Sequence, residues 1–221
     1  MLTSKDDLLE IGSSAVKNGN YDIAISAFHS FVLRDLKCVE ANNIRDMIYK
    51  YYDNYGEAIK DFDRAIELKP ECAAAYYNRA CTYRKDVDDV QQAISNFTKA
   101  IELRSGYAEA YNNLAVQHVK MGRFEEAARE FARAIAIAGP SALLLGNLAY
   151  AQRRLDRLPE AAASARAALH LDSGSPQAHL ILGSILAQDP RTRAESIPHL
   201  ERAAETMPSA RTILERVREL R

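Results

Sequence analysis

The chain has 221 residues, of which 48% are hydrophobic and 27% are charged, and its formal net charge is −1. This balance of apolar and charged residues is typical of a folded chain and argues against intrinsic disorder. A net charge near zero provides no overall field for a polyanion, so we expect neither nucleic acid nor a membrane as a partner.

The N-terminal residues, the absence of long apolar stretches and the cysteine pattern indicate a cytoplasmic protein. Residues 1–7 contain no apolar signal core, and no later stretch approaches the roughly 18 consecutive apolar residues of a membrane span. The cysteines are Cys38, Cys72 and Cys81, and they form no C-x-x-C pair. We therefore expect reduced thiols and no disulfide, metal or cofactor.

A small residue recurs every 34 or 35 residues and defines a six-fold internal repeat. The recurring residues are Ala24, Ala58, Ala93, Ala127, Ala161 and Ser196. A period of this length predicts a solenoid, in which each repeat packs mainly on its neighbours. The predicted repeats form one continuous domain over 1–221, and they span 5–38, 39–72, 73–107, 108–141, 142–175 and 176–210, with a capping helix over 209–221.

Each repeat predicts two amphipathic helices joined by a short turn. In the repeat 108–141, Tyr111, Leu114 and Ala115 recur at helical spacing, and Gly122 is placed to end the first helix in a left-handed conformation. The fold class is therefore all-α, with antiparallel helix hairpins.

Prolines and a serine indicate where later helices begin. Pro159 and Pro198 should each lie in the first turn of a helix, where the missing N–H costs nothing. Ser209 is placed to cap the last helix.

These patterns resemble the tetratricopeptide repeat family over about residues 5–210. Residues 111–115 (Tyr-Asn-Asn-Leu-Ala) and 124–127 (Phe-Glu-Glu-Ala) match the family pattern closely. The first helix of the repeat 39–72 departs from it, since Asn42, Arg45 and Asp46 replace large or small apolar residues, and we expect a helix of shifted register there. The resemblance implies a right-handed superhelix whose first helices line a concave groove for a peptide or a partner helix.

Asparagines at one equivalent position of three repeats are the first candidate site. Asn78, Asn113 and Asn147 would form a ladder along the groove, with Tyr77 and Asn112 beside them. A carboxamide both donates and accepts, so it can pair with a peptide backbone whatever its sequence. The alternative is that asparagine serves only the structure at this position.

Basic residues near the ends of the first helices are the second candidate. Arg84, Lys85, Lys120 and Arg153 would attract acidic peptides, as would Lys17, Lys50 and Arg154 in the same row. The alternative is that these cations only complement the helix dipole, by about 0.3–1 kcal/mol each.

No catalytic constellation is present in the sequence. The five histidines show no metal-ligand spacing, and there is no glycine-rich phosphate loop. We expect a non-enzymatic protein-interaction scaffold that binds a protein or an acidic peptide. The alternative is a structural or self-assembling module, which would form a homo-oligomer.

The composition changes near residues 111–123. Every lysine lies at or before Lys120, and only arginines supply positive charge after it. Tyrosines are nearly confined to the same part, since Tyr150 alone lies beyond Tyr111. Arginine and lysine serve a solvated helix about equally well, so stability does not require this change. We interpret it as a natural or engineered chimera of two repeat arrays without a single evolved ligand, the alternative being drift within one lineage.

Overall fold

The computed structural model describes residues 4–18, 55–85 and 89–220, together with positions 20, 23, 26, 27 and 30. The first helix predicted for the repeat 39–72 lies outside the described residues, as do Ala24, Cys38, Lys50 and part of the turn after Lys85.

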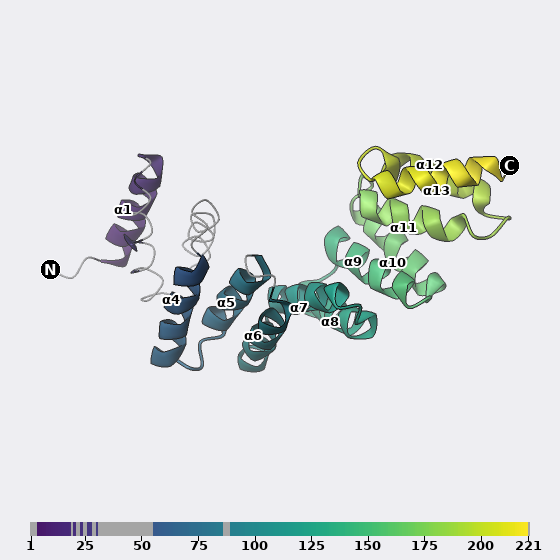
Figure 1. The fold of residues 1–221 in the computed structure, drawn as a ribbon. Coiled ribbons are helices and arrows are strands. Elements are labelled where there is room, and N and C mark those ends of the chain that lie inside the picture. Colours follow the sequence, from purple (N-terminus) through teal and green to yellow (C-terminus); the bar gives the residue numbers. More distant parts are fainter. Residues whose placement is uncertain are drawn as a thin grey trace. The chain divides into compact units, whose positions relative to one another are not determined.

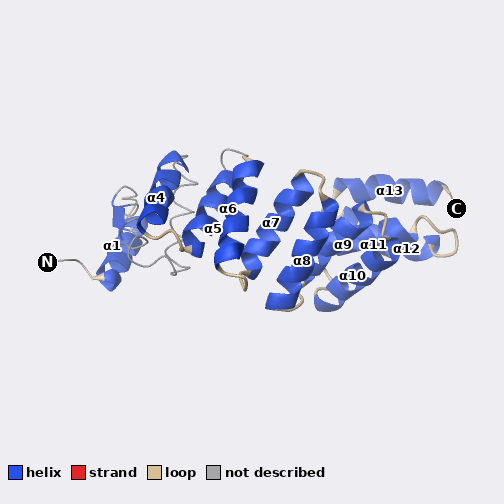
Figure 2. Cartoon of the chain, turned by 90° about the horizontal axis from the view of Figure 1, so that it is seen from below, coloured by secondary structure: helices blue, strands red, loops and turns tan. Residues whose placement is uncertain are grey.

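All regular secondary structure in these ranges is helical, as Figure 2 shows, and they contain no strand. The all-α prediction is confirmed. The chain divides into two compact units, Met1–Gly106 and Tyr107–Arg221. The boundary between them falls where the predicted third and fourth repeats meet.

The first unit contains four described helices. They are α1 (Lys5–Lys17), α4 (Tyr55–Leu68), α5 (Ala73–Lys85) and α6 (Val90–Leu103). Helix α4 packs on α5, and α5 forms a hairpin with α6. The Asp89 carboxylate accepts a hydrogen bond from the backbone N–H of Gln92 and so caps α6.

The second unit contains three hairpins and a closing helix, which can be followed in Figure 1. The helices are α7 (Ala108–Lys120), α8 (Phe124–Ala138), α9 (Ala142–Arg154), α10 (Leu158–Leu171), α11 (Pro176–Leu186), α12 (Arg193–Ala204) and α13 (Pro208–Glu219). Helix α7 pairs with α8, α9 with α10, and α11 with α12, while α13 packs on α12. Gly122 ends the turn after α7 with φ of 72°, as the sequence predicts.

The repeated small residues lie where the helices cross. Ala93, Ala127, Ala161 and Ser196 are all 0% exposed. Four positions later, three of the second helices carry a large core residue, which is Phe97 in α6, Phe131 in α8 and Leu200 in α12, whereas α10 has the buried Ala165 there. The alternation of small and large side chains fills the space between the helices.

Gly183 marks a particularly close approach of α11 and α12. A Cβ atom at this position would lie 2.9 Å from Leu200 Cγ and 3.2 Å from His199 Cβ. Helix α11 can therefore pack against α12 at this distance only without a side chain here.

A polar pair joins the two helices of three hairpins beside the core. In each pair one partner directly precedes the main core position of the second helix. The pairs are Arg79 Nε to Asn96 Oδ1, Ser164 Oγ to Gln152 Oε1, and His179 Nδ1 with His199 Nδ1, each at 2.8 Å.

Two predicted helix starts are wrong, and a third is confirmed. Pro159 lies in the first turn of α10 as expected. Pro198, however, lies inside α12, which begins at Arg193. The Asp189 carboxylate accepts hydrogen bonds from the backbone N–H and the guanidinium of Arg191 and so closes the turn before the helix, which lets α12 begin ahead of the proline. Ser209 is not the cap of α13, because Pro208 takes the first helical position and makes Met207 the N-cap.

None of the described helices combines the length and apolar composition needed to cross a membrane.

Candidate functional site

A row of carboxamides connects the three first helices of the second unit. Asn147 on α9 donates from Nδ2 to Asn112 Oδ1 on α7, at 3.5 Å. Gln177 on α11 donates from Nε2 to Asn147 Oδ1 and to the Gly146 carbonyl, each at 3.4 Å. We call Asn112, Asn147 and Gln177 the carboxamide row.

The row is accessible and has unused hydrogen-bonding capacity. All three side chains are only half-buried. Each carboxamide can donate two hydrogen bonds and accept two, and at 3.4–3.5 Å the bonds within the row are longer than normal N–H···O hydrogen bonds. A ligand backbone could therefore bind these groups by adding hydrogen bonds or by replacing the weak ones.

One face of α9 extends the site on either side of Asn147. Leu143, Asn147, Tyr150 and Arg154 follow one another at steps of four, three and four residues, so they lie on the same side of the helix. Leu143 is 64% exposed, although leucine is usually buried. This face presents an apolar group, an amide, an aromatic ring and a cation to solvent.

The predicted asparagines have different environments. Asn113 is half-buried on α7, where its neighbour Asn112 is the residue bonded to Asn147. Asn78, in the first unit, is only 5% exposed, and its Nδ2 has no hydrogen-bond partner among the described residues. Tyr77 is half-buried beside it, with its ring centroid 5.7 Å from that of Phe97. Asn78 is thus a poorly accessible candidate.

The predicted basic residues are only partly described. Arg84 and Lys85 belong to the last turn of α5, and their side chains lie outside the described part of the structure. Lys120 is exposed at the end of α7. Arg153 is half-buried, and its Nε is buried without a hydrogen bond to any residue that the structure describes.

Two features of the site were missed in the sequence. Gln177 is equivalent to Glu109 and Leu143 in the preceding repeats, so no recurring residue type marks it. The second feature is a cluster of Phe124, Tyr150 and Arg154, signalled only by the four-residue spacing of the last two. The Arg154 guanidinium carbon lies 4.2 Å from the Phe124 ring centroid, and Nη1 donates to Tyr150 Oη at 3.1 Å.

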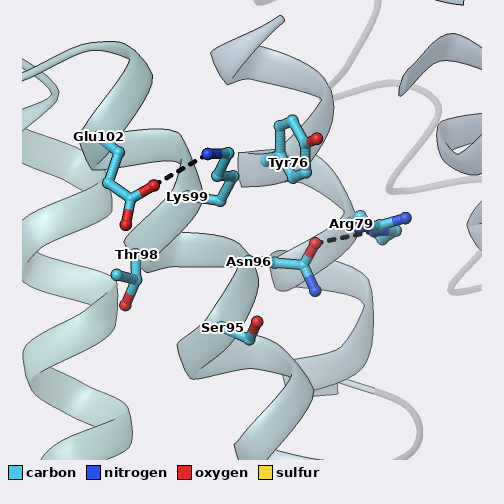
Figure 3. A pocket seen from close by; sticks show the side chains of 7 residues that line it. All are labelled: Tyr76, Arg79, Ser95, Asn96, Thr98, Lys99 and Glu102. Carbon is cyan, nitrogen blue, oxygen red and sulfur yellow. Dashed lines mark hydrogen bonds and ion pairs between the residues drawn. The ribbon is translucent and has the colours of Figure 1, made fainter. Parts of the chain in front are cut away.

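A hollow of about 340 Å³ lies between α5 and α6 (Figure 3). Its cations already have partners. Arg79 binds Asn96 and forms an ion pair with Asp63 at 2.5 Å, and Lys99 binds Glu102 at 3.0 Å. The remaining lining is Tyr76, Ser95 and Thr98. Because these charges are neutralised within the protein, the hollow has no clear attraction for a charged ligand.

The described residues contain no group of three or more His, Cys, Asp or Glu that could hold a metal ion. His179 and His199 form a pair, with their ring centroids 5.1 Å apart. Burial, followed by electrostatic interaction with His179 and with the Arg166 guanidinium, lowers the pKa of His199, so its neutral form is favoured. His179 Nε2 contacts the Ser173 carbonyl oxygen at 2.9 Å, which orients its ring.

Sequence profiles of the tetratricopeptide repeat match most of the chain. One profile matches residues 9–45, 51–88 and 143–210, and a second matches 86–145. The chain belongs to the tetratricopeptide repeat family. Family membership makes the protein one of a class of interaction scaffolds that bind proteins or peptides. No curated protein sequence matched the chain.

Solved structures share the tetratricopeptide repeat fold. The crystal structure of MamA protein is 24% identical, with a TM-score of 0.61 over 78% of this chain and 94% of that one. YrrB, described as a TPR protein with an unusual peptide-binding site, has the same identity and TM-score over 71% and 81%. TTC0263, a thermophilic TPR protein in Thermus thermophilus, is 18% identical, with a TM-score of 0.56 over 83% and 99%. At these identities the likeness establishes the fold alone.

Proposed function

We propose that this tetratricopeptide repeat protein is a non-enzymatic scaffold that binds an extended peptide along the first helices of its second unit, in the concave groove that the family pattern implies. The proposal depends on the carboxamide row, which connects equivalent helices of three successive repeats. Carboxamides that face solvent in a continuous row are suited to a backbone, which alternates donors and acceptors.

The dimensions of such a row suit an extended chain. Packed helices lie about 8–10 Å apart, and an extended peptide advances about 3.3 Å per residue. One contact per repeat therefore corresponds to about every third peptide residue. Peptide side chains between these contacts would remain free to select neighbouring groups such as Leu143, which is exposed.

Basic groups favour acidic peptides. Lys120 is exposed at the end of α7, and Arg153 follows Asn147 on α9 by less than two turns. Arg84 and Lys85 are the corresponding candidates in the first unit. Such cations steer an acidic ligand and increase its association rate, and added salt weakens the effect.

Selection from a displayed library of random dodecapeptides tests the proposal. We expect the wild-type chain to retain a set of peptides, and the triple variant Asn112→Ala, Asn147→Ala, Gln177→Ala to lose them. His170→Ala is the control, because His170 is exposed on the second helix α10, away from the row. Circular dichroism and melting temperature establish that each variant is folded.

Two results contradict the proposal. Equal retention by the triple variant would show that the row does not bind peptide. If the wild type retains no peptide, and its mass in solution rises with concentration, a self-assembling module is the better description.

A further inference from the structure

The cluster of Phe124, Tyr150 and Arg154 holds one guanidinium in a fixed position. The ring centroids of Phe124 and Tyr150 are 6.3 Å apart in an edge-to-face arrangement. Arg154 lies over the Phe124 ring and donates to the Tyr150 hydroxyl, so contacts from two helices, α8 and α9, restrict its side chain. An arginine restricted in this way loses less conformational entropy when it binds an anion.

The charge of Arg154 is not neutralised within the described part of the chain. Arg154 is exposed and forms no ion pair with any residue that the structure describes. A nearby arginine shows the contrast, since Arg157 donates from Nη2 to the Glu125 carboxylate at 2.9 Å. Glu125 lies next to Phe124 in the sequence, yet it is Arg157 that it binds.

Arg154 is also close to the carboxamide row. It follows Asn147 by seven residues on the same face of α9, which is about two helical turns. Its side chain reaches back towards Tyr150. Measured along the axis of α9, the guanidinium therefore lies roughly one helical turn, or about 5 Å, beyond Asn147. A side chain of a peptide bound to Asn147 could span this distance.

We propose that Arg154 is the anchor for a carboxylate of the bound peptide, with Phe124 and Tyr150 as its support. This inference rests on the proposed function, and it names the residue that selects acidic ligands. A guanidinium has five N–H groups in a planar fork, of which one is used by Tyr150, and the fork matches the two oxygens of a carboxylate. The carboxylate belongs to an Asp or Glu side chain or to the peptide's C-terminus.

Two displayed libraries distinguish these sources of the carboxylate. One presents random dodecapeptides internally, and the other presents them with a free C-terminus. If the carboxylate is a side chain, we expect the wild type to enrich Asp or Glu at one fixed position of the first library. If it is the C-terminus, we expect the wild type to enrich peptides of the second library whose selected residues lie at a fixed distance from the C-terminus. Either enrichment supports the anchor and identifies the source.

The affinity of a selected synthetic peptide, measured by fluorescence anisotropy, then tests the residue itself. Amidating the carboxylate should weaken binding to the wild type by about ten- to a hundredfold, the usual range for a hydrogen bond to a charged group. With Arg154→Ala the same amidation should have little effect, because the two changes remove one interaction. Arg154→Lys should fall between the two, since lysine keeps the charge and loses the fork. Arg157→Ala is the matched control and should bind as the wild type does.

Distinct results overturn the anchor and the proposed function. If peptides bind through the row but amidation costs the same in the wild type and in Arg154→Ala, Arg154 is not the anchor and the groove function remains. If the wild type selects no peptide, the proposed function fails, and the anchor fails with it. Arg154 is exposed, so its substitution should leave the melting temperature nearly unchanged.

Discussion

The same substitution at two helical glycines should change stability in opposite directions. Gly146 and Gly183 lie inside α9 and α11 of the same unit. Replacing a helical glycine by alanine normally stabilises a protein by about 0.5–1 kcal/mol, because the unfolded glycine has more conformational freedom. At Gly146 an added Cβ would meet nothing closer than Gln177 Cδ at 3.9 Å, so we expect this gain in full.

At Gly183 the added methyl group should outweigh the gain. The Cβ would lie 2.9 Å and 3.0 Å from two Leu200 atoms and 3.2 Å from His199 Cβ. The Leu200 side chain is fully buried, and His199 Cβ is attached directly to the α12 backbone, so neither can move aside without shifting α12. Overpacking of this kind costs about 1–3 kcal/mol. We expect a net loss of about 0.5–2 kcal/mol once the helix gain is subtracted.

Urea unfolding of both variants, combined with amide hydrogen exchange, measures these effects. Faster exchange in Gly183→Ala should be concentrated in α11, α12 and α13, which pack together. If Gly183→Ala stabilises the protein as much as Gly146→Ala does, the close crossing of α11 and α12 is wrong.

Three further predictions concern the second unit. The pKa of His199 is lowered by burial, His179 and Arg166, so the unfolded chain binds a proton at this residue more readily than the folded chain does. The free energy of unfolding should therefore have its full value above about pH 6.5 and decrease as the pH falls below it. His199→Gln should reduce this dependence in urea titrations at several pH values. Ser141→Ala should lower the free energy of unfolding by about 1 kcal/mol, because its hydroxyl caps α9, whereas Ser209→Ala, at an uncapped helix, should leave the denaturation midpoint nearly unchanged. Phe131→Ala should cost about 3–5 kcal/mol by calorimetry, since the ring is 1% exposed and its removal leaves a cavity in the core; a cost below 1 kcal/mol would contradict the packing.

Periodicity predicted the hairpins because it records burial directly. A position such as Ala127 or Phe131 must match the space between helices, so the residue type reveals its place in each repeat. Helix ends were predicted less well, since they depend on competing local bonds. Pro198 shows this, because the Asp189–Arg191 contact sets the start of α12 and leaves the proline inside the helix.

The candidate site was predictable only in part. Asn112 and Asn147 were both identified, but their contact depends on the relative position of α7 and α9, which residue type does not encode. Gln177 has no counterpart in the preceding repeats. Arg154 was grouped with other basic residues near helix ends, and its distinction comes from Phe124 on a different helix.

The polar pairs within the hairpins also help to determine which helices assemble. Repeats of similar length and apolar pattern are prone to pair with the wrong neighbour during folding. Here a histidine pair joins α11 to α12, whereas a serine–glutamine pair joins α9 to α10. A first helix that docked on the second helix of another repeat would leave a half-buried polar side chain without its partner and lose a hydrogen bond worth about 0.5–1.5 kcal/mol. The hairpins that carry such a pair thus differ from one another, and misassembled or domain-swapped arrangements of these helices are disfavoured even though the apolar repeat would permit them.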